Sequence, residues 1–321
     1  MKPLASLSLD LDNQWSYMRT HGDAGWESFP SYLDLLVPRV LAFLSRHGLK
    51  ITFFVVGQDA VLPRNRAALA ALAAAGHEIG NHSFNHLPWL HLFGEAEIEA
   101  EIGQAEEAIA AATGQRPRGF RGPGFSLSPA TLRVLSRRGY RYDASTLPTF
   151  IGPLARAYYL LSSRLSAGER QKRRRLFGTW REGLRPLTPY YWRLGESRLL
   201  EIPVTTLPVL RTPIHVSYLL YLGGFSPALA RSYLRAALAL CRWAGVSPSL
   251  LLHPLDFLGA GEVPEVAFFP AMNRPAEHKL REVAEHLAAF RERFQVVSVG
   301  EHADALLALA GRNGIPEQAA G

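Results

Sequence analysis

The sequence predicts an α/β protein whose core is a (β/α)7–8 barrel, interrupted by one basic, aromatic-rich insertion. Segments with the pattern of buried strands alternate with helical segments, which indicates a parallel sheet covered by helices. Seven or eight such units in one chain suggest a closed barrel. The composition, with 48% apolar and 20% charged residues over 321 positions, supplies a large core and excludes a disordered or collagen-like chain. A single cysteine, Cys241, excludes a disulfide scaffold.

Each predicted strand is a short run of apolar, β-branched or aromatic residues, which is typical of strands buried on both faces. The first run ends in two acids, and the second, with the sequence ITFFVVG, shows the pattern most clearly. In chain order, strands are expected at residues 4–12, 51–57, 77–81, 119–125, 140–145, 199–205, 249–257 and 295–299.

The predicted helices lie between these strands and have their own start and stop signals. Gly48 and Gly76 follow the first two helices, and acids occupy the first turns of the third. Ser128 and Pro129 begin the fourth helix as its N-cap and its first helical residue. Helices are expected at residues 31–47, 64–75, 95–112, 128–138, 227–244, 275–294 and 301–310.

These elements form one expected barrel domain over residues 1–310, with an insertion at 147–198 and a flexible tail at 311–321. The N-terminus is interpreted as the first core strand, because its apolar run is too short for a signal peptide and continues into Asp10 and Asp12. No run of about 18 uncharged apolar residues occurs, so no transmembrane helix is expected. We therefore expect a cytoplasmic protein.

Positive charge is concentrated in the insertion. The chain has a net charge of +7, yet residues 147–198 contain 11 Lys and Arg against 3 Asp and Glu, so this segment carries +8 and the remainder −1. A nearly neutral barrel argues against a nucleic-acid partner. The insertion also holds 8 of the 33 aromatic residues, and its most basic stretch is Lys172, Arg173, Arg174 and Arg175. This pattern suits an anionic membrane surface or a pyrophosphate-linked sugar, and a solvated lid over the barrel mouth is the alternative.

Two acids, Asp10 and Asp12, end the first predicted strand. Side chains at positions i and i+2 of a strand point to the same side. Two neighbouring carboxylates repel each other unless a cation or a shared proton intervenes. One of them can therefore bind a metal while the other acts as a base, and a solvated strand end is the alternative.

Two histidines, His82 and His86, follow the third predicted strand. On a helical turn, a spacing of four places both imidazoles on one face, near enough to bind one ion. Two imidazoles and one carboxylate leave coordination positions for water and substrate, which is typical of a catalytic metal site. Chance proximity among 11 histidines is the alternative.

Two further motifs lie at later strand ends. Arg121 precedes a Gly122-Pro123-Gly124 turn, and an arginine there can pair with a carboxylate. The glycines of the turn let backbone N–H groups approach an oxyanion. His253 ends an apolar run and can act as a general acid. The alternatives are a surface salt bridge, a plain turn and a core histidine.

The order of these motifs and the residues within them resemble the polysaccharide deacetylases, carbohydrate esterase family four, which includes nodulation-factor deacetylases. The resemblance covers residues 4 to about 145 and roughly 199 to 300. The matching segments are Asp10 to Asp12, TFFVVG at 52–57, HEIGNHSFNH at 77–86, Arg121 to Phe125, and LHP at 252–254.

The resemblance implies a distorted barrel, one divalent metal and a pair of proton-transfer residues. Zinc is the expected metal for one Asp and two His, with iron, cobalt and nickel as the alternatives. Asp10 matches the catalytic base of the family, Arg121 the arginine that tethers this base, and His253 the catalytic acid. The residues that match the metal ligands are Asp12, His82 and His86.

The sequence departs from the family pattern in three places. Asp-Leu-Asp replaces Asp-Asp-Gly, as in a branch that includes cyclic-imide and allantoin-type hydrolases and lipid-linked sugar deformylases. Gly124 precedes Phe125, so the oxyanion-binding N–H can come from either residue. The acidic partner of the catalytic histidine is Asp143 or Asp256.

The resemblance and the basic insertion together imply a metal-dependent hydrolase that removes an acetyl or formyl group from an amino sugar. The expected substrate is a lipid-linked or precursor glycan at the cytoplasmic face of the inner membrane. The alternative is a cyclic-imide or ureide hydrolase of a small soluble substrate, which needs no membrane-facing segment. A third interpretation, an inactive sugar-binding barrel, is disfavoured because all six polar site residues are present.

Overall fold

The computed structural model describes residues 2–154, 168, 180–309 and 315–320. Its centre is a parallel sheet in the spatial order β7-β5-β4-β3-β2-β1-β8, and β9 pairs with the start of β1. These strands are β1 (Leu4–Asp10), β2 (Thr52–Val55), β3 (Glu78–Asn81), β4 (Gly119–Phe120), β5 (Tyr142–Asp143), β7 (Ser197–Glu201), β8 (Ser249–Leu252) and β9 (Gln295–Val297).

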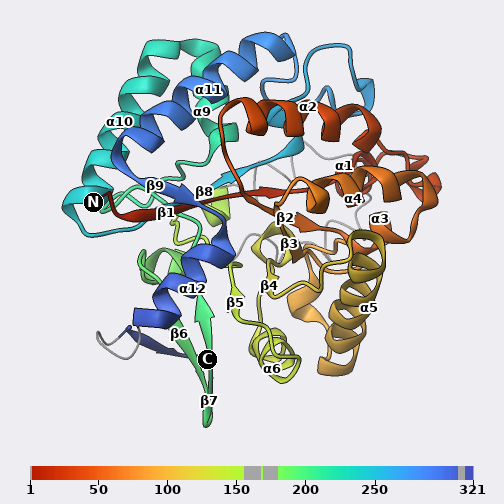
Figure 1. Ribbon diagram of the computed structural model, residues 1–321, viewed down its shortest axis with the longest axis vertical. Helices are drawn as coiled ribbons and strands as arrows, with labels where there is room; N and C mark the ends of the chain where they lie inside the picture. The colour runs from red at the N-terminus through yellow and green to blue at the C-terminus, as the bar shows by residue number, and fades with distance from the viewer. Residues whose placement is uncertain (1, 155–167, 169–179, 310–314, 321) are drawn as a thin grey trace.

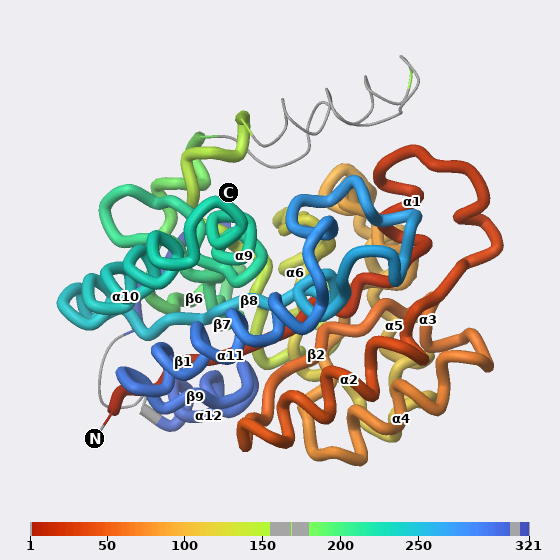
Figure 2. The backbone as a smooth tube through the Cα atoms, turned by 90° about the horizontal axis from the view of Figure 1, so that it is seen from above, coloured from red at the N-terminus to blue at the C-terminus, as the bar shows by residue number. Residues whose placement is uncertain are grey.

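The helices surround this sheet, which confirms the predicted α/β barrel class (Figure 1). Figure 2 shows α9 and α10 toward one end of the molecule and α2, α3, α4 and α5 toward the other, with α11 drawn across β1. The helices are α1 (Gln14–His21), α2 (Leu33–Arg46), α3 (Gly57–Val61), α4 (Arg66–Ala74), α5 (Glu95–Thr113), α6 (Pro129–Arg137), α9 (Val216–Phe225), α10 (Pro227–Trp243), α11 (Ala276–Arg293) and α12 (Val299–Leu309).

The strand ladder does not close into a complete barrel. At one edge, the chain leaving β7 passes beside β8, where the Thr205 backbone N–H donates to the Ser249 carbonyl over 3.0 Å. The Ser249 N–H in turn donates to the Thr205 hydroxyl over 2.7 Å. Two hydrogen bonds, one of them to a side-chain hydroxyl, therefore join the segment after β7 to β8 in place of a regular strand ladder, which is the distortion of this barrel.

Both faces of the central strands are buried. In β1, Leu7 and Leu9 belong to the main apolar core, while Ser6 and Ser8 alternate with them and are also fully buried. At the N-terminal end of the strands, α12 covers the barrel, since His302 lies 3.2 Å from the Ser6 hydroxyl. The C-terminal ends of the strands lie at the opposite end of the barrel from α12, and they carry the candidate site residues that the sequence analysis singled out.

The later part of the chain contains three elements that the sequence analysis did not predict. The insertion was expected to extend to residue 198, but β6 (Tyr190–Leu194) is an antiparallel strand of the main sheet, paired with β7. The tail was expected to be flexible, but β10 (Glu317–Ala319) pairs with β6. Helix α9 was not predicted, because its sequence VSYLLYLGGF has no charged residues to mark a polar face.

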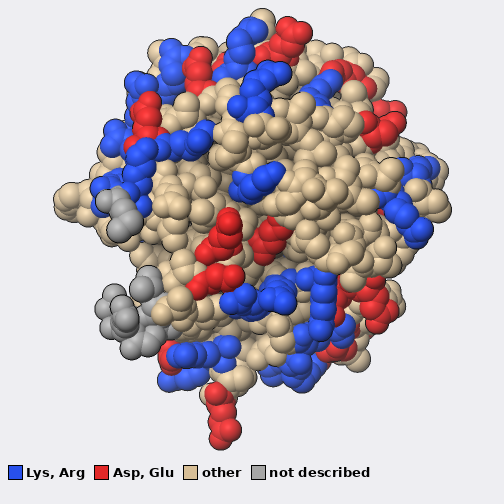
Figure 3. Space-filling model, in the orientation of Figure 1, with Lys and Arg blue, Asp and Glu red and all other residues tan. Residues whose placement is uncertain are grey.

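Charges on the described surface are mixed. In the view of Figure 3, basic and acidic side chains interleave over the barrel, as a body of nearly zero net charge should show. Within the described residues, no helix is long and apolar enough to span a membrane. Most of the insertion's charge, including Lys172, Arg173, Arg174 and Arg175, lies outside the described residues.

Candidate active site

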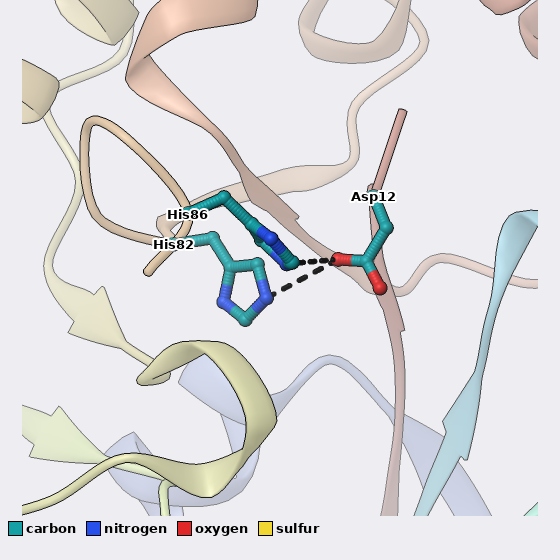
Figure 4. A group of neighbouring side chains, drawn as sticks. All are labelled: Asp12, His82 and His86. Atoms are coloured by element: carbon teal, nitrogen blue, oxygen red, sulfur yellow. Dashed lines mark hydrogen bonds and ion pairs between the residues drawn. The ribbon is translucent and has the colours of Figure 1, made fainter. Parts of the chain in front are cut away.

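Asp12, His82 and His86 come together at the C-terminal ends of β1 and β3 (Figure 4). The Asp12 Oδ1 atom lies 3.3 Å from His82 Nε2 and 2.9 Å from His86 Nε2. All three side chains are buried, and their ligand atoms lie within 4.8 Å of one another. The structure therefore brings together the two motifs that the sequence analysis proposed as one metal site.

Backbone contacts orient His82 toward this group. Its Nδ1 lies 2.6 Å from the Arg121 carbonyl oxygen, which can only accept a hydrogen bond, so Nδ1 carries the proton and Nε2 is left to face Asp12. The arrangement follows from strand pairing: Asn81 and Phe120 are opposite each other in β3 and β4, so His82 and Arg121 are the next residues on neighbouring strands.

The loop that carries the histidines is not the helical turn that the sequence predicted. Ser83 and His86 both have left-handed backbone conformations, with φ angles of 60° and 50°. Side chains from two helices support the loop. Glu101 of α5 accepts the N–H groups of Phe84 and Asn85, and Arg19 of α1 donates to the His86 carbonyl over 2.7 Å. Sequence reasoning missed Glu101 and Arg19, because nothing local marks them as partners of a distant loop.

These three residues fit a divalent ion. Ligands about 2.1 Å from a tetrahedral ion lie roughly 3.4 Å apart, close to the separations between Asp12 and the imidazoles. Burial would raise the pKa of Asp12, but attraction to His86 and hydrogen bonds from both imidazoles outweigh it, so the pKa is held well below its usual range. His86 Nδ1 is buried without a hydrogen-bond partner among the described residues, so its ring is less firmly fixed than that of His82.

Asp10 is bound to a fully buried arginine. The Arg121 Nη1 donates to Asp10 Oδ1 over 2.7 Å and to the Ser8 hydroxyl over 2.8 Å. The Arg121 Nε donates to the Ala144 carbonyl, and the guanidinium lies 4.3 Å from the centre of the Phe54 ring. Contacts to β1, to β2 and to the residue after β5 therefore fix this guanidinium, and through it the carboxylate of Asp10.

The turn after Arg121 depends on its glycines. A Cβ atom at Gly122 would lie 2.0 Å from the Ser126 carbonyl oxygen, so no larger residue fits there. Gly124 and Phe125 are left-handed, with φ angles of 57° and 61°. The Phe125 N–H already donates to the Gly122 carbonyl, which makes Gly124 the better candidate of the two for an oxyanion contact.

His253 follows β8 as Asp10 ends β1. Leu9 and Leu252 are paired across these neighbouring strands, so Asp10 and His253 are the next residues at the same edge. The His253 Nδ1 lies 3.0 Å from the hydroxyl of Ser217, a residue that sequence reasoning missed. The same hydroxyl donates to Asp256 Oδ1 over 2.7 Å.

The structure also separates the two acids considered as partners of His253. Asp256 connects with it through Ser217, and Asp256 Oδ2 accepts the His253 backbone N–H over 2.8 Å. Asp143 is instead opposite Glu201 in β5 and β7 and accepts the Ser145 hydroxyl over 2.6 Å. Burial and the neighbouring carboxylate of Glu201 raise the pKa of Asp143 well above its usual range.

Residues 23–142 match the family model for polysaccharide deacetylases. This part of the chain is similar to that family. The matched segment contains His82, His86 and Arg121, while Asp10, Asp12 and His253 lie outside it.

The chain resembles the peptidoglycan deacetylase of Helicobacter pylori, with 27% identity over 151 residues, 45% of this chain and 50% of that protein. Other curated relatives are named as chitin, chitooligosaccharide and peptidoglycan-N-acetylglucosamine deacetylases. The alignments span 37% of the chitin deacetylase, 46% of the chitooligosaccharide deacetylase and 30% of the peptidoglycan-N-acetylglucosamine deacetylase, so the chain covers at most half of the length of these curated relatives.

Two solved structures share the fold over almost the whole chain. A protein from Mycobacterium smegmatis, provisionally named a polysaccharide deacetylase, has a TM-score of 0.62 at 21% identity and covers 96% of this chain and 91% of its own. The crystal structure of Puue allantoinase has a TM-score of 0.59 at 17% identity and covers 97% and 93%. At these identities both likenesses concern the fold, so they do not distinguish an amino-sugar substrate from a ureide.

Proposed function

We propose that this protein is a metal-dependent hydrolase that removes an N-acyl group, acetyl or formyl, from an amino sugar. The observation that carries the proposal is the buried group of Asp12, His82 and His86 at the same barrel end as the Arg121-bound Asp10. The similarity of residues 23–142 to the polysaccharide deacetylase family and the names of the curated relatives support the sugar substrate.

The proposed metal is zinc, held by Asp12, His82 and His86. One carboxylate and two imidazoles are a donor set that zinc accepts readily. A divalent ion bound there supplies a Lewis acid that polarises the amide carbonyl and makes water more acidic. The other steps of hydrolysis belong to residues of the chain.

Asp10 acts as the proposed general base. It accepts a proton from the attacking water as the oxygen of that water bonds to the amide carbon. The guanidinium of Arg121, held by the Ala144 carbonyl and the Ser8 hydroxyl, keeps the carboxylate in a fixed orientation. The backbone N–H of Gly124 is the proposed donor to the oxyanion that develops on the substrate.

His253 acts as the proposed general acid. An amide nitrogen leaves poorly as an anion, so the C–N bond breaks only as the nitrogen receives a proton. His253 Nε2 supplies this proton, and the products are a free amine and acetate or formate. The pairing of β1 with β8 supports the assignment, since it places base and acid on neighbouring strand ends.

An acyl-release assay tests this proposal. The zinc-loaded protein is incubated with N-acetylglucosamine oligosaccharides, with an N-formyl amino sugar and with allantoin, and acetate, formate or ring-opened ureide is quantified. Release of acetate or formate with formation of free amine supports the proposal. Turnover of allantoin alone would favour the ureide hydrolase, and binding of sugar with no turnover of any substrate would favour an inactive barrel.

We further propose that the substrate is lipid-linked and is met at an anionic membrane surface, on the cytoplasmic face. The net charge of +8 in residues 147–198 matches the anionic lipids of that leaflet. Described residues at the ends of this segment add exposed apolar groups, with Leu154 71% and Trp180 57% exposed. The loop around Arg211, which donates to the Arg185 carbonyl of this segment, adds Val209, which is 81% exposed. Basic and apolar side chains of this kind suit the headgroup region of a bilayer.

A further inference from the structure

A hydroxyl group lies between the catalytic histidine and a buried acid. Ser217, in the first turn of α9, has its Oγ 3.0 Å from His253 Nδ1 and 2.7 Å from Asp256 Oδ1. The backbone N–H of His253 donates to Asp256 Oδ2 over 2.8 Å, so both carboxylate oxygens are engaged. The three side chains form a continuous chain of hydrogen bonds from Asp256 to the imidazole.

The direction of this chain follows from the chemistry of its members. An ionised carboxylate only accepts hydrogen bonds, and a serine hydroxyl has a single proton to donate. Ser217 therefore donates its proton to Asp256 and accepts a hydrogen bond from His253. The imidazole must then carry a proton on Nδ1, which leaves Nε2 as the atom that exchanges a proton with substrate.

The surroundings keep Asp256 and His253 in place. Lys279 of α11 is buried and donates to the carbonyl oxygens of Leu255 and Leu258, which holds the turn that contains Asp256. The ring of His215 lies edge-on to His253, with 5.5 Å between ring centres. Burial keeps the pKa of His215 well below its usual range, so this neighbour stays uncharged.

We propose that Ser217 is a positioning residue for the hydrolysis, which acts by relaying the orienting effect of Asp256 to His253 and fixing the Nδ1–H tautomer. The inference rests on the proposed function, because it takes His253 as the proton donor. As His253 releases the proton from Nε2 to the leaving amine, the Nε2–H bond breaks and the Nδ1 proton stays in its hydrogen bond to Ser217. The tautomer formed at that moment is the one that the Ser217–Asp256 pair stabilises.

The test reads the tautomer directly. The zinc-loaded full chain is labelled with ¹⁵N-histidine, and the two ring nitrogens of His253 are identified by comparison with a His253→Gln variant. The wild type should show protonated Nδ1 and unprotonated Nε2 when the ring is neutral. Ser217→Ala and Asp256→Asn should both shift the ring toward a mixture of tautomers, because each breaks the directed chain.

Kinetics of the same variants provide the second readout. Ser217→Ala should lower kcat roughly tenfold with little change in KM, a smaller loss than the ~100-fold or more expected when the acid itself is removed. Ser217→Thr keeps a hydroxyl and should recover much of the lost kcat, while the distant control Ser136→Ala should behave as wild type. Circular dichroism confirms that each variant is folded.

The outcomes separate the two proposals. A neutral His253 ring that is protonated on Nε2 in the wild type, or the same tautomer in wild type, Ser217→Ala and Asp256→Asn, overturns the positioning role of Ser217. A wild-type protein that releases no acyl group from any substrate overturns the proposed function, and the NMR comparison still decides whether the hydrogen-bond chain exists.

Discussion

The six polar residues that the sequence marked as a site come from four motifs spread over more than 240 positions. Strand register explains why they meet. Leu9 pairs with Leu252 and Asn81 with Phe120, so each motif begins one residue beyond a paired position. Because parallel strands end at one edge, motif order and strand prediction sufficed to expect the cluster. Ser217 has no such signal, since it lies in a helix whose start is not marked by composition and 36 residues before His253.

The first prediction concerns the metal. His86→Ala should reduce the metal content from about one equivalent per chain to near zero, because Asp12 and His82 alone form a weak two-ligand site. Elemental analysis of dialysed protein measures this. His91→Ala, which changes a histidine outside the group, is the matched control and should keep its metal. An unchanged metal content in His86→Ala would contradict the ligand assignment.

Mutation should separate the role of the general base, Asp10, from that of the metal ligand two residues later, Asp12. Asp10→Asn keeps the size of the side chain and leaves Asp12 in place, so the metal content should remain near one equivalent while turnover falls by roughly 100-fold or more. His253→Ala should behave in the same way, since His253 is not part of the metal-binding group. Metal analysis and the acyl-release assay on the same preparations check this. Activity near that of the wild type in either variant would show that the base or the acid is wrongly assigned.

At the scale of elements, sequence located the strands better than the loops between them. The loop 82–86 was expected to be a helical turn, because two histidines four residues apart lie on one face of a helix. Its conformation in the structure depends on left-handed backbone at Ser83 and His86, and neither residue type indicates a left-handed backbone from sequence alone. Support comes from Glu101 of α5. Such tertiary contacts decide a loop's shape and are not encoded in its own residues.

Lys279 links α11 to the turn that carries Asp256, and this link predicts a pH dependence of stability. Burial lowers the pKa of Lys279 from 10.5 to about 8. Between pH 8 and 10.5 the unfolded chain therefore binds more protons at this residue than the folded chain does. The contribution of Lys279 to the free energy of unfolding should rise with pH across this window, by up to about 3 kcal/mol.

Urea unfolding of wild type and Lys279→Met between pH 7.5 and 10.5 measures this contribution. The free energy of unfolding of wild type minus that of the variant should increase with pH, because methionine has no proton to lose. Lys2→Met, at an exposed position, is the control and should run parallel to wild type. A pH-independent difference between wild type and Lys279→Met would contradict the buried-cation interpretation.

On the scale of the whole molecule, the architecture was predictable but its edges were not. Alternating apolar strands and helices predicted the parallel sheet, because burial on both faces demands that pattern. Strands β6 and β10 were missed. The three residues of β10 are exposed and two of them, Glu317 and Gln318, are polar, so they form a strand only because β6 offers an edge. An element stabilised by pairing rather than by burial leaves little trace in hydropathy.

The distribution of charge over the molecule leads to the last prediction, that the protein binds anionic membranes through residues 147–198. This segment carries +8 while the rest of the chain carries −1. Each Lys or Arg near an anionic surface contributes about 1 kcal/mol, so four engaged residues are enough for measurable binding. The attraction should weaken with salt, because the Debye length falls from about 10 Å at 0.1 M to about 3 Å at 1 M.

Co-sedimentation with liposomes of increasing anionic lipid content measures the binding. Replacement of Lys172, Arg173, Arg174 and Arg175 by Glu should abolish it. The control reverses four exposed charges on the helices of the barrel, Arg46, Arg66, Arg235 and Arg281, and should retain most of the binding despite an identical net charge. Equal loss in both variants would mean that net charge alone drives the attraction. Binding insensitive to lipid charge, salt and the first substitution would contradict membrane docking, and the segment would then act as a lid over a soluble substrate.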